Sequence, residues 1–348
     1  MNQYASVDHS ASAPVIADLR SDTVTKPDAA MRAAMAGAEV GDDVFGDDPT
    51  VSRLESTLAE RLGKEAGLFL GSGTQSNFVA MLAHCARGEE IVTGRGYHIH
   101  KYEAMGASVL GGIAFDPVEV AADGALDPDA VRAAIKPDDP HMPMTRLLGL
   151  ENTHGGKAIA ITRLEDAVAV ARKAGLATHL DGARYFNAVA ALNCSEAAMA
   201  DLFDTVSICL SKGLGAPAGS VLIGPRELID RARRWRKMLG GGMRQVGVLA
   251  AAGLYALDHN VARLSEDHAR ATVLADGLRP LGRVDHATNT IFFTPEGGIT
   301  PELIRHMGDH GVKLLGSIGT GRLVVHKDVT DAGIDATLQG FRAALSAQ

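Results

Sequence analysis

The sequence predicts an α/β protein with a large, mostly parallel sheet and a smaller α+β region near its C-terminus. Between about residue 50 and residue 225, short apolar runs alternate with segments of helical period. This alternation is typical of a parallel sheet with helical crossovers. The apolar runs at 205–210 and 220–223 are separated by about nine residues, too few for a crossover helix. One strand of the sheet is therefore expected to be antiparallel.

The elements of the large domain follow from apolar spacing and from glycine, proline and polar stops. Helices are expected at 27–35, where Pro27 opens the first turn, and at 50–63, 77–85, 128–135, 164–173, 230–238 and 246–257. Strands are expected at 66–70, 90–93, 108–111, 116–120, 147–151, 176–180, 205–210 and 220–223.

The C-terminal part follows a shorter alternation. A charged helix from about residue 260 leads to strands at 283–286, 290–294, 312–315 and 322–325, with a helix at 301–310. We therefore expect a loose tail at 1–17, a large domain with an N-terminal arm at 18–259, and a small α+β domain at 260–348.

Composition excludes several classes of protein. The 348 residues are 46% hydrophobic and 22% charged, which is average for a globular protein with a sizeable core. The net charge is −8 without a long basic run, which argues against a nucleic-acid partner. No apolar run approaches the length of about 20 residues that spans a bilayer, and no secretory signal pattern opens the chain. Cys85, Cys194 and Cys209 lack CxxC spacing, so reduced thiols and a cytoplasmic location are expected.

Lys212 stands where the strand predicted at 205–210 gives way to a glycine-rich loop. Small residues beside it, among them Gly213 and Gly215, would let a bulky group approach its nitrogen. A lysine placed in this way can form a Schiff base with an aldehyde. A solvated lysine in a turn is the alternative.

Two other strand ends carry polar groups. The segment 71–75, GSGTQ, joins a predicted strand to a predicted helix, where backbone N–H groups and the helix dipole favour an anion. Ser72 and Thr74 add hydroxyl groups, and the pattern fits a single phosphate better than a dinucleotide. Asp181 follows another apolar run, where ligand groups gather in open α/β sheets. An ordinary βα turn and a helix N-cap are the respective alternatives.

Two patterns hint at metals without specifying one. The segment 41–49, GDDVFGDDP, is rich in aspartate but lacks the EF-hand spacing, so we expect a structural loop and no metal. His98-x-His100 lacks a third ligand, and a histidine on such a loop could equally stack on a ring or act as a base.

Together these features match the needs of pyridoxal 5′-phosphate. Its phosphate needs N–H donors, its pyridine nitrogen an anionic partner and its aldehyde an amine. The glycine turn, Asp181 and Lys212, which follows Asp181 by 31 residues, supply one of each.

With these residues in view, the sequence resembles the low-specificity L-threonine aldolase family of fold type I pyridoxal-phosphate enzymes. The resemblance covers residues 16–329 and rests on DLRSDTVTKP, VGDDVFGDDP, SGTQSN, LLGLENTHGGK, DGAR, ICLSKGLGAPAGS, WRKMLGGGMRQ and GRLVVHKD. It implies a transferase-like fold and reversible cleavage of L-threonine and L-allo-threonine to glycine and an aldehyde. The Cα–Cβ bond would break in an external aldimine, and the expected assembly is a homotetramer.

The resemblance also assigns roles by position. Matching positions are Lys212, His98 and His141 for catalysis; Ser72, Gly73, Thr74, His98, Asp181, Arg184, Lys212, Lys237 and Arg244 for the cofactor; and Ser21, His141, Arg184 and Arg322 for the substrate. Lys237 and Arg244 would lie near the phosphate across a subunit interface. Phe45 and Tyr102 depart from some relatives, which carry tyrosine and phenylalanine there, and could alter side-chain preference.

Three other functions remain open at this point. A β-eliminating amino-acid lyase would release ammonia and a keto acid in place of glycine and aldehyde. Racemisation would be a side activity. A non-catalytic small-molecule-binding protein that keeps the fold would take up no pyridoxal phosphate. For proton transfer from the substrate hydroxyl, His98 is the candidate base, with a water under His98 or His141 as the alternative.

Overall fold

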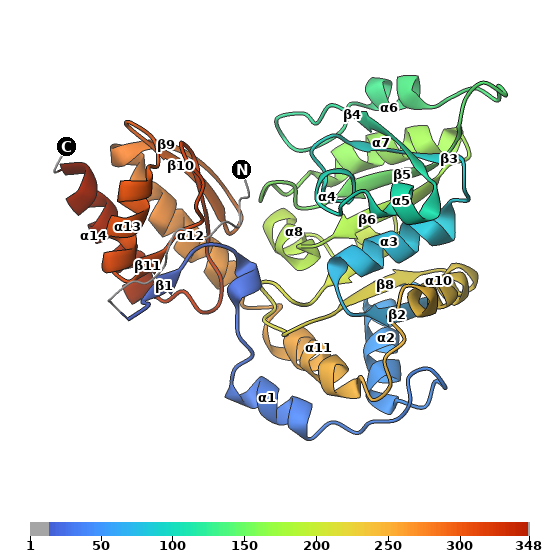
Figure 1. Cartoon of the computed structure of the whole chain (residues 1–348), viewed down its shortest axis with the longest axis horizontal. Helices are drawn as coiled ribbons and strands as arrows, with labels where there is room; N and C mark the ends of the chain where they lie inside the picture. Colours follow the sequence, from blue (N-terminus) through green and yellow to red (C-terminus); the bar gives the residue numbers. More distant parts are fainter. Residues whose placement is uncertain (1–13, 347–348) are drawn as a thin grey trace. The chain divides into compact units, whose positions relative to one another are not determined.

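The computed structural model describes residues 14–346, which form two compact units (Figure 1). The larger unit contains Pro27–Ser211 and Ala216–Asp258. The smaller unit contains the described residues up to Lys26, the short segment Lys212–Gly215 and the chain from His259 onward. No helix in the described part of the chain is long and apolar enough to cross a membrane.

A seven-stranded sheet forms the centre of the larger unit, in the order β2-β8-β7-β6-β5-β3-β4. Its strands are β2 (Ala66–Leu70), β3 (Glu89–Gly94), β4 (Ala114–Val118), β5 (Met144–Glu151), β6 (Ala177–Gly182), β7 (Thr205–Cys209) and β8 (Ser220–Gly224). Strand β8 is antiparallel to both of its neighbours, and the other neighbouring pairs are parallel. The α/β class and the single antiparallel strand expected from the short 210–220 connection are confirmed.

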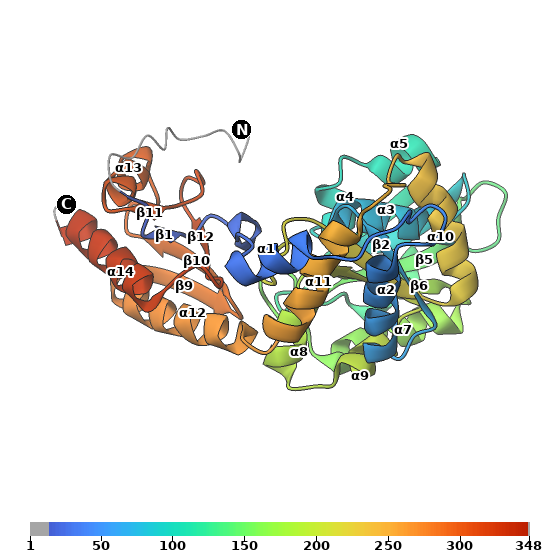
Figure 2. The same cartoon turned by 90° about the horizontal axis from the view of Figure 1, so that it is seen from below.

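Helices cover both faces of this sheet. They are α1 (Ala29–Ala36), α2 (Pro49–Arg61), α3 (Gly73–His84), α4 (His98–Lys101), α5 (Gly106–Gly111), α6 (Pro128–Ala134), α7 (Ile161–Lys173), α8 (Tyr185–Leu192), α9 (Glu196–Ala200), α10 (Arg226–Met238) and α11 (Gly247–His259). Helices α3 and α10 pack together on one face, and α2 and α7 lie on the other (Figure 2). Buried aliphatic side chains from α3, α10, β2 and β8 form one continuous core.

The start of α2 shows how sequence determines a helix end in this unit. Asp48 accepts hydrogen bonds from the N–H groups of Thr50 and Val51, each at 3.1 Å, and Pro49 occupies the first turn. An aspartate cap followed by proline satisfies exposed donors without losing a helical hydrogen bond. In α1 the N-cap is Asp28, so the helix begins after Pro27. We had expected it to begin at Pro27.

The segment 108–111 was predicted as a strand and lies in the helix α5, so that prediction was wrong. The apolar run is short, and such a run does not distinguish a strand from a buried helical turn. Gly112 ends the helix with a φ of 66°, a conformation that glycine adopts without strain. Helix α5 contacts α3 and buries Ala107 and Gly111, whereas Val109 and Leu110 remain exposed.

The smaller unit has an antiparallel sheet in the order β12-β10-β9 and a parallel pair, β1-β11. Its elements are β1 (Ala17–Asp18), the 3₁₀ turn η1 (Asp22–Val24), α12 (Leu264–Leu278), η2 (Arg279–Leu281), β9 (Gly282–Ala287), β10 (Thr290–Pro295), α13 (Pro301–Asp309), β11 (Val312–Lys313), β12 (Gly321–Val324) and α14 (Asp331–Ser346). One hydrophobic core joins the helices to this sheet.

We expected the residues from 18 onward to belong to the large domain, but those up to Lys26 belong to the smaller unit. Ala17 pairs with Val312 and Asp18 with Lys313, and Val324 donates its N–H to the carbonyl of Leu19. These main-chain bonds hold the described residues up to Lys26 in the unit built mainly from the C-terminal chain. Most of the tail expected at 1–17 lies outside the described residues.

Candidate active site

Asp181 lies at the carboxyl end of β6, in the middle of the large sheet, and is only 2% exposed. Its Oδ1 accepts the N–H of Ala183 at 3.0 Å, and its Oδ2 accepts Nδ2 of Asn77 at 2.9 Å. Helix α8 begins beyond it with Arg184 at the N-cap position, so Asp181 does not serve as that helix cap. The two donors fix the orientation of this buried carboxyl group at a strand end, where ligand groups gather in open α/β sheets.

Asn77 joins Asp181 to a second buried carboxyl group. The same amide nitrogen donates to Oε1 of Glu103 at 2.8 Å, so its two hydrogens serve two acids. Burial raises the pKa of Glu103, and the negative charge of Asp181 raises it further. The hydrogen bonds from His98 and Asn77 act in the opposite direction.

His98 is held at both its main chain and its ring. The N–H donates to Oε2 of Glu151 at 2.6 Å, and Nδ1 lies 2.8 Å from Oε1 of Glu103. The ring also lies 5.7 Å from that of Tyr102, measured between centroids. Because the imidazole side chain is 38% exposed, it is fixed in orientation yet open to a ligand.

The ligand atoms of His98, Glu103 and Asp181 all lie within 4.8 Å of one another, a spacing that could hold a metal ion. Each of the three already bonds to a neighbouring polar group. The three groups therefore belong to one polar network, in which Oε2 of Glu103 is buried without a hydrogen-bond partner.

The start of α3 has the form of an anion site. Ser72 is the N-cap, and its Oγ accepts the N–H of Gln75 at 3.1 Å. The N–H groups of Gly73 and Thr74 stand in the first turn, where a helix provides no carbonyl for them. Backbone donors at the positive end of a helix of 12 residues suit a phosphate group.

The aspartate-rich loop at 41–49 uses its carboxylates within the protein. Asp42 pairs with Arg244 at 2.9 Å, and buried Asp43 pairs with buried Arg236 at 2.7 Å. Asp48 accepts the N–H of Gly247 at 2.8 Å. These bonds tie the loop to α10 and to the chain that follows it, as a structural loop requires.

The two basic residues assigned to the phosphate lie on this same part of the chain. Arg244 is engaged by Asp42, and its guanidinium lies 5.9 Å from the ring centroid of Phe45. Lys237 is exposed, and its aliphatic part packs so closely on Gly242 that a side chain there would clash. A role for either at a phosphate remains a prediction.

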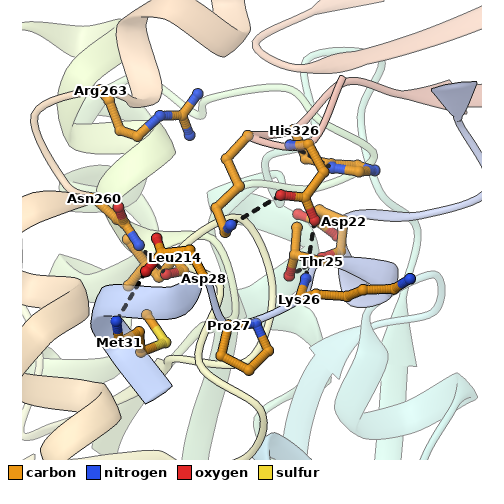
Figure 3. A network of polar contacts seen from close by, with 12 residues as sticks. Asp22, Thr25, Lys26, Pro27, Asp28, Met31, Leu214, Asn260, Arg263 and His326 are labelled. Carbon is orange, nitrogen blue, oxygen red and sulfur yellow. Dashed lines mark hydrogen bonds and ion pairs between the residues drawn. The ribbon is translucent and has the colours of Figure 1, made fainter. Parts of the chain in front are cut away.

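Lys212 lies in the loop that belongs to the smaller unit. Its carbonyl accepts Oγ1 of Thr25 at 2.7 Å and the N–H of Gly215 at 2.8 Å. Asn260 donates to the carbonyl of Leu214 at 2.7 Å, which anchors the same loop (Figure 3). The main chain at Lys212 and at Leu214 is therefore held by Thr25 and Asn260, which are distant in sequence.

The structure brings Ser21 and Arg322 close together in the smaller unit. Nη2 of Arg322, on β12, donates to the carbonyl of Arg20 at 3.3 Å, and Ser21 is the next residue. Ser21 caps η1 by accepting the N–H of Thr23. A shared role for these two residues at a substrate carboxylate remains a prediction.

Arg184 and His141 differ in their surroundings. Arg184 is half-buried three residues after Asp181, at the start of α8. The His141 side chain is 88% exposed, and its Nδ1 lies 2.8 Å from Oδ1 of Asp139. Both the N–H and the ring of His141 bond to Asp139, and a role for His141 near the substrate hydroxyl stays a prediction.

Sequence reasoning missed the residues that connect this site. Asn77 was placed on a helix without a role, and Glu103, Glu151 and His179 were not singled out. Glu151 ends an apolar strand just as Asp181 does, and that spacing could have revealed it. For Asn77, Glu103 and His179 the sequence carries no comparable pattern, because their partners are far away along the chain.

Comparison with known proteins is decisive at this point. The chain is 50% identical over 331 residues to "Low specificity L-threonine aldolase" of Escherichia coli (strain K12), covering 94% of this chain and 99% of the relative. The chain belongs to the low-specificity L-threonine aldolase family. The sequence model described as beta-eliminating lyase matches residues 18–294 of this family member.

Solved structures agree with this membership at the level of the fold. The Leishmania major threonine aldolase is 22% identical with a TM-score of 0.81, covering 94% of this chain and 99% of the other. A structure described as SPT with PLP is 18% identical with a TM-score of 0.72, covering 95% and 87%. The aldolase-family chain therefore has the fold type I architecture of pyridoxal-phosphate enzymes.

Proposed function

We propose that this chain is a pyridoxal-phosphate-dependent lyase that cleaves L-threonine, L-allo-threonine and related β-hydroxy-α-amino acids. The reaction is reversible and yields glycine and an aldehyde by breaking the Cα–Cβ bond. The observation that carries the proposal is the linked set Asp181–Asn77–Glu103–His98 at the strand ends of a threonine aldolase family member. It supplies a buried anion beside an oriented imidazole.

The residues present fit the cofactor. Asp181, buried and held by two donors, suits the protonated pyridine nitrogen, and the start of α3 with Ser72, Gly73 and Thr74 suits the phosphate. Lys212 would hold the aldehyde carbon, with its loop anchored by Thr25. When bound, the cofactor draws electrons from the bond that breaks at the substrate Cα.

The chain's own residues would orient the substrate and move one proton. Arg322 and Ser21 in the smaller unit, together with Arg184, would bind the substrate carboxylate, and an arginine does this with two parallel hydrogen bonds. Holding the carboxylate fixes which bond at Cα is aligned for cleavage.

His98 is the group we assign to the substrate β-hydroxyl. Because Nδ1 is held by Glu103, Nε2 is the atom that would accept the hydroxyl proton as the Cα–Cβ bond breaks. The hydrogen bond from the backbone N–H to Glu151 fixes the main chain at His98, and the contact of Nδ1 with Glu103 fixes the ring. A water acting under His98 or His141 is the alternative route for the same proton.

A second function within the same chemistry is favoured by the family match itself. The match to a family described as beta-eliminating lyase spans most of the chain, and elimination would release ammonia and a keto acid. The purified protein loaded with pyridoxal phosphate should be offered L-threonine, L-allo-threonine, L-phenylserine and D-threonine separately. Glycine and aldehyde in equal amounts from the L-isomers is the expected result. Ammonia with a keto acid, and no glycine, would replace our proposal with elimination.

The role of His98 predicts the behaviour of His98→Asn. Asparagine keeps some polarity but cannot take up a proton, so kcat should fall about 10²-fold or more. Steady-state release of acetaldehyde from L-threonine measures this. His100→Asn is the matched control, because His100 lies on the same short helix and bonds to the carbonyl of Arg95. Unchanged turnover in His98→Asn would remove His98 as the base.

We also propose that the protein is a cytoplasmic homotetramer. Several large apolar side chains are exposed, among them Phe45 (76%), Val109 (73%) and Met238 (72%), and contact with further copies would cover them. The three cysteines are free, as expected in a reducing compartment.

A further inference from the structure

A chain of hydrogen bonds continues from Asn77 away from the ligand side of the site. Oδ1 of Asn77 lies 3.2 Å from Nε2 of His179, on β6. Nδ1 of His179 lies 2.9 Å from Oγ1 of Thr205, the first residue of β7. That same hydroxyl oxygen lies 2.8 Å from Nε2 of His84, the last residue of α3. The polar path crosses the sheet interior from one helix end to the site.

Donors and acceptors along this path allow one consistent assignment. Asn77 gives both amide hydrogens to Asp181 and Glu103, so its oxygen must accept from Nε2–H of His179. A neutral His179 then has a bare Nδ1, which must accept the hydroxyl hydrogen of Thr205. The Thr205 oxygen in turn accepts Nε2–H of His84. In this assignment each polar hydrogen of the path has an acceptor.

The surroundings keep both histidines neutral. His179 and Thr205 are fully buried. Burial lowers the pKa of His179 to about 3, the nearby His84 lowers it further, and a hydrogen bond with the Thr205 backbone acts in the opposite direction. Burial also lowers the pKa of His84 to about 4, where Asp204 acts in the opposite direction and Arg231 in the same direction. A proton on either ring would place a second donor where the path needs an acceptor or an apolar neighbour.

We propose that His179 is a positioning residue which, as a single neutral Nε2–H tautomer, locks the Asn77 amide so that its two hydrogens hold Asp181 and Glu103. Thr205 and His84 hold His179 in that tautomer. If the Asn77 amide turned over, its oxygen would face two carboxyl groups and its nitrogen would face a donor. The lock therefore keeps the anion for the cofactor ring and the acceptor for His98 in place together.

The inference rests on the proposed function in one respect, that Asp181 serves the cofactor. A simple packing role is the competing explanation. It predicts that any substitution of His179 lowers stability and that cofactor affinity follows stability. Burying polar groups in the centre of the sheet costs free energy unless each group has a hydrogen-bond partner, and apolar side chains would pack there without that requirement.

Two substitutions at the same position separate these explanations. The amide nitrogen of glutamine in His179→Gln reaches roughly as far as Nε2 and can still donate to Asn77. The shorter asparagine in His179→Asn ends near the Nδ1 position and cannot. We expect the Kd for pyridoxal phosphate, measured by absorbance titration, to rise about tenfold in His179→Asn and to stay within about threefold in His179→Gln. Equal Kd values in the two variants would overturn the proposal.

The tautomer is tested without the cofactor. In ¹⁵N-histidine NMR spectra of the ligand-free protein, the resonances of His179 are those that disappear in His179→Gln. At pH 5.5 these resonances should be those of a neutral ring with its hydrogen on Nε2. An ordinary histidine is mostly protonated at this pH. Thr205→Val removes the donor to Nδ1 of His179 and should shift the Nδ1 resonance, whereas Thr205→Ser should leave it unchanged. An Nδ1–H or doubly protonated ring at His179 in the wild type would overturn the proposal even if every His179 variant failed to fold.

These outcomes also distinguish the two proposals. A wild type that binds no pyridoxal phosphate refutes the proposed function, and the spectra still decide the tautomer lock. A wild type that binds the cofactor, with the His179→Asn and His179→Gln variants indistinguishable from each other, refutes the lock alone.

Discussion

Replacing Lys212 with alanine is expected to abolish covalent attachment of pyridoxal phosphate and to lower threonine cleavage at least about 10³-fold. The amine at this position is the group that would bind the aldehyde carbon, and no other side chain could replace it. Thr25 and Asn260 hold the main chain of this loop, so the substitution should leave the fold intact. The measurement is borohydride reduction followed by peptide mass spectrometry, alongside acetaldehyde release.

A matched control shows that the effect belongs to this lysine. Lys173, exposed at the end of α7, can be replaced with alanine without touching the proposed site. The Lys173→Ala protein should carry the reduced cofactor on residue 212 and turn over normally. A cofactor adduct on any other lysine of the wild type would show that Lys212 is wrongly assigned.

Replacing Asp181 with asparagine is expected to lower kcat/KM for L-threonine by about 10²- to 10³-fold at saturating cofactor. The substitution keeps the volume but removes the negative charge opposite the cofactor's ring nitrogen. It also places an amide against the amide of Asn77, which now donates to Oδ2 at 2.9 Å. Cofactor affinity should fall as well, and absorbance titration would measure it.

Asp166→Asn, on the exposed side of α7, is the control for the loss of one negative charge. That variant loses the same charge far from the strand ends and should behave as wild type. Turnover of Asp181→Asn within about twofold of wild type would contradict the role of this carboxylate, since a lost charge contact at a reacting centre costs far more.

Much of the large sheet could be predicted because its strands carry local patterns. The run at 66–70 was predicted with the bounds that β2 has in the structure. The short connection before Ser220 indicated an antiparallel strand, and β8 is antiparallel to β7. The segment 108–111, which lies in α5, was mistaken for a strand because a run of four residues is too short to distinguish a helix from a strand by its period.

The sequence by itself determined the alternation of strands and helices, the charged residue at the end of β6 and the glycine turn before α3. These depend on neighbours along the chain, so spacing alone reveals them. Only the tertiary structure decided that Asn77 bridges Asp181 and Glu103, and that His179 stands behind Asn77. Asn77 and Asp181 are 104 residues apart, and no local pattern says which buried polar groups will meet. The requirement that every buried donor find an acceptor acts only once the chain has folded.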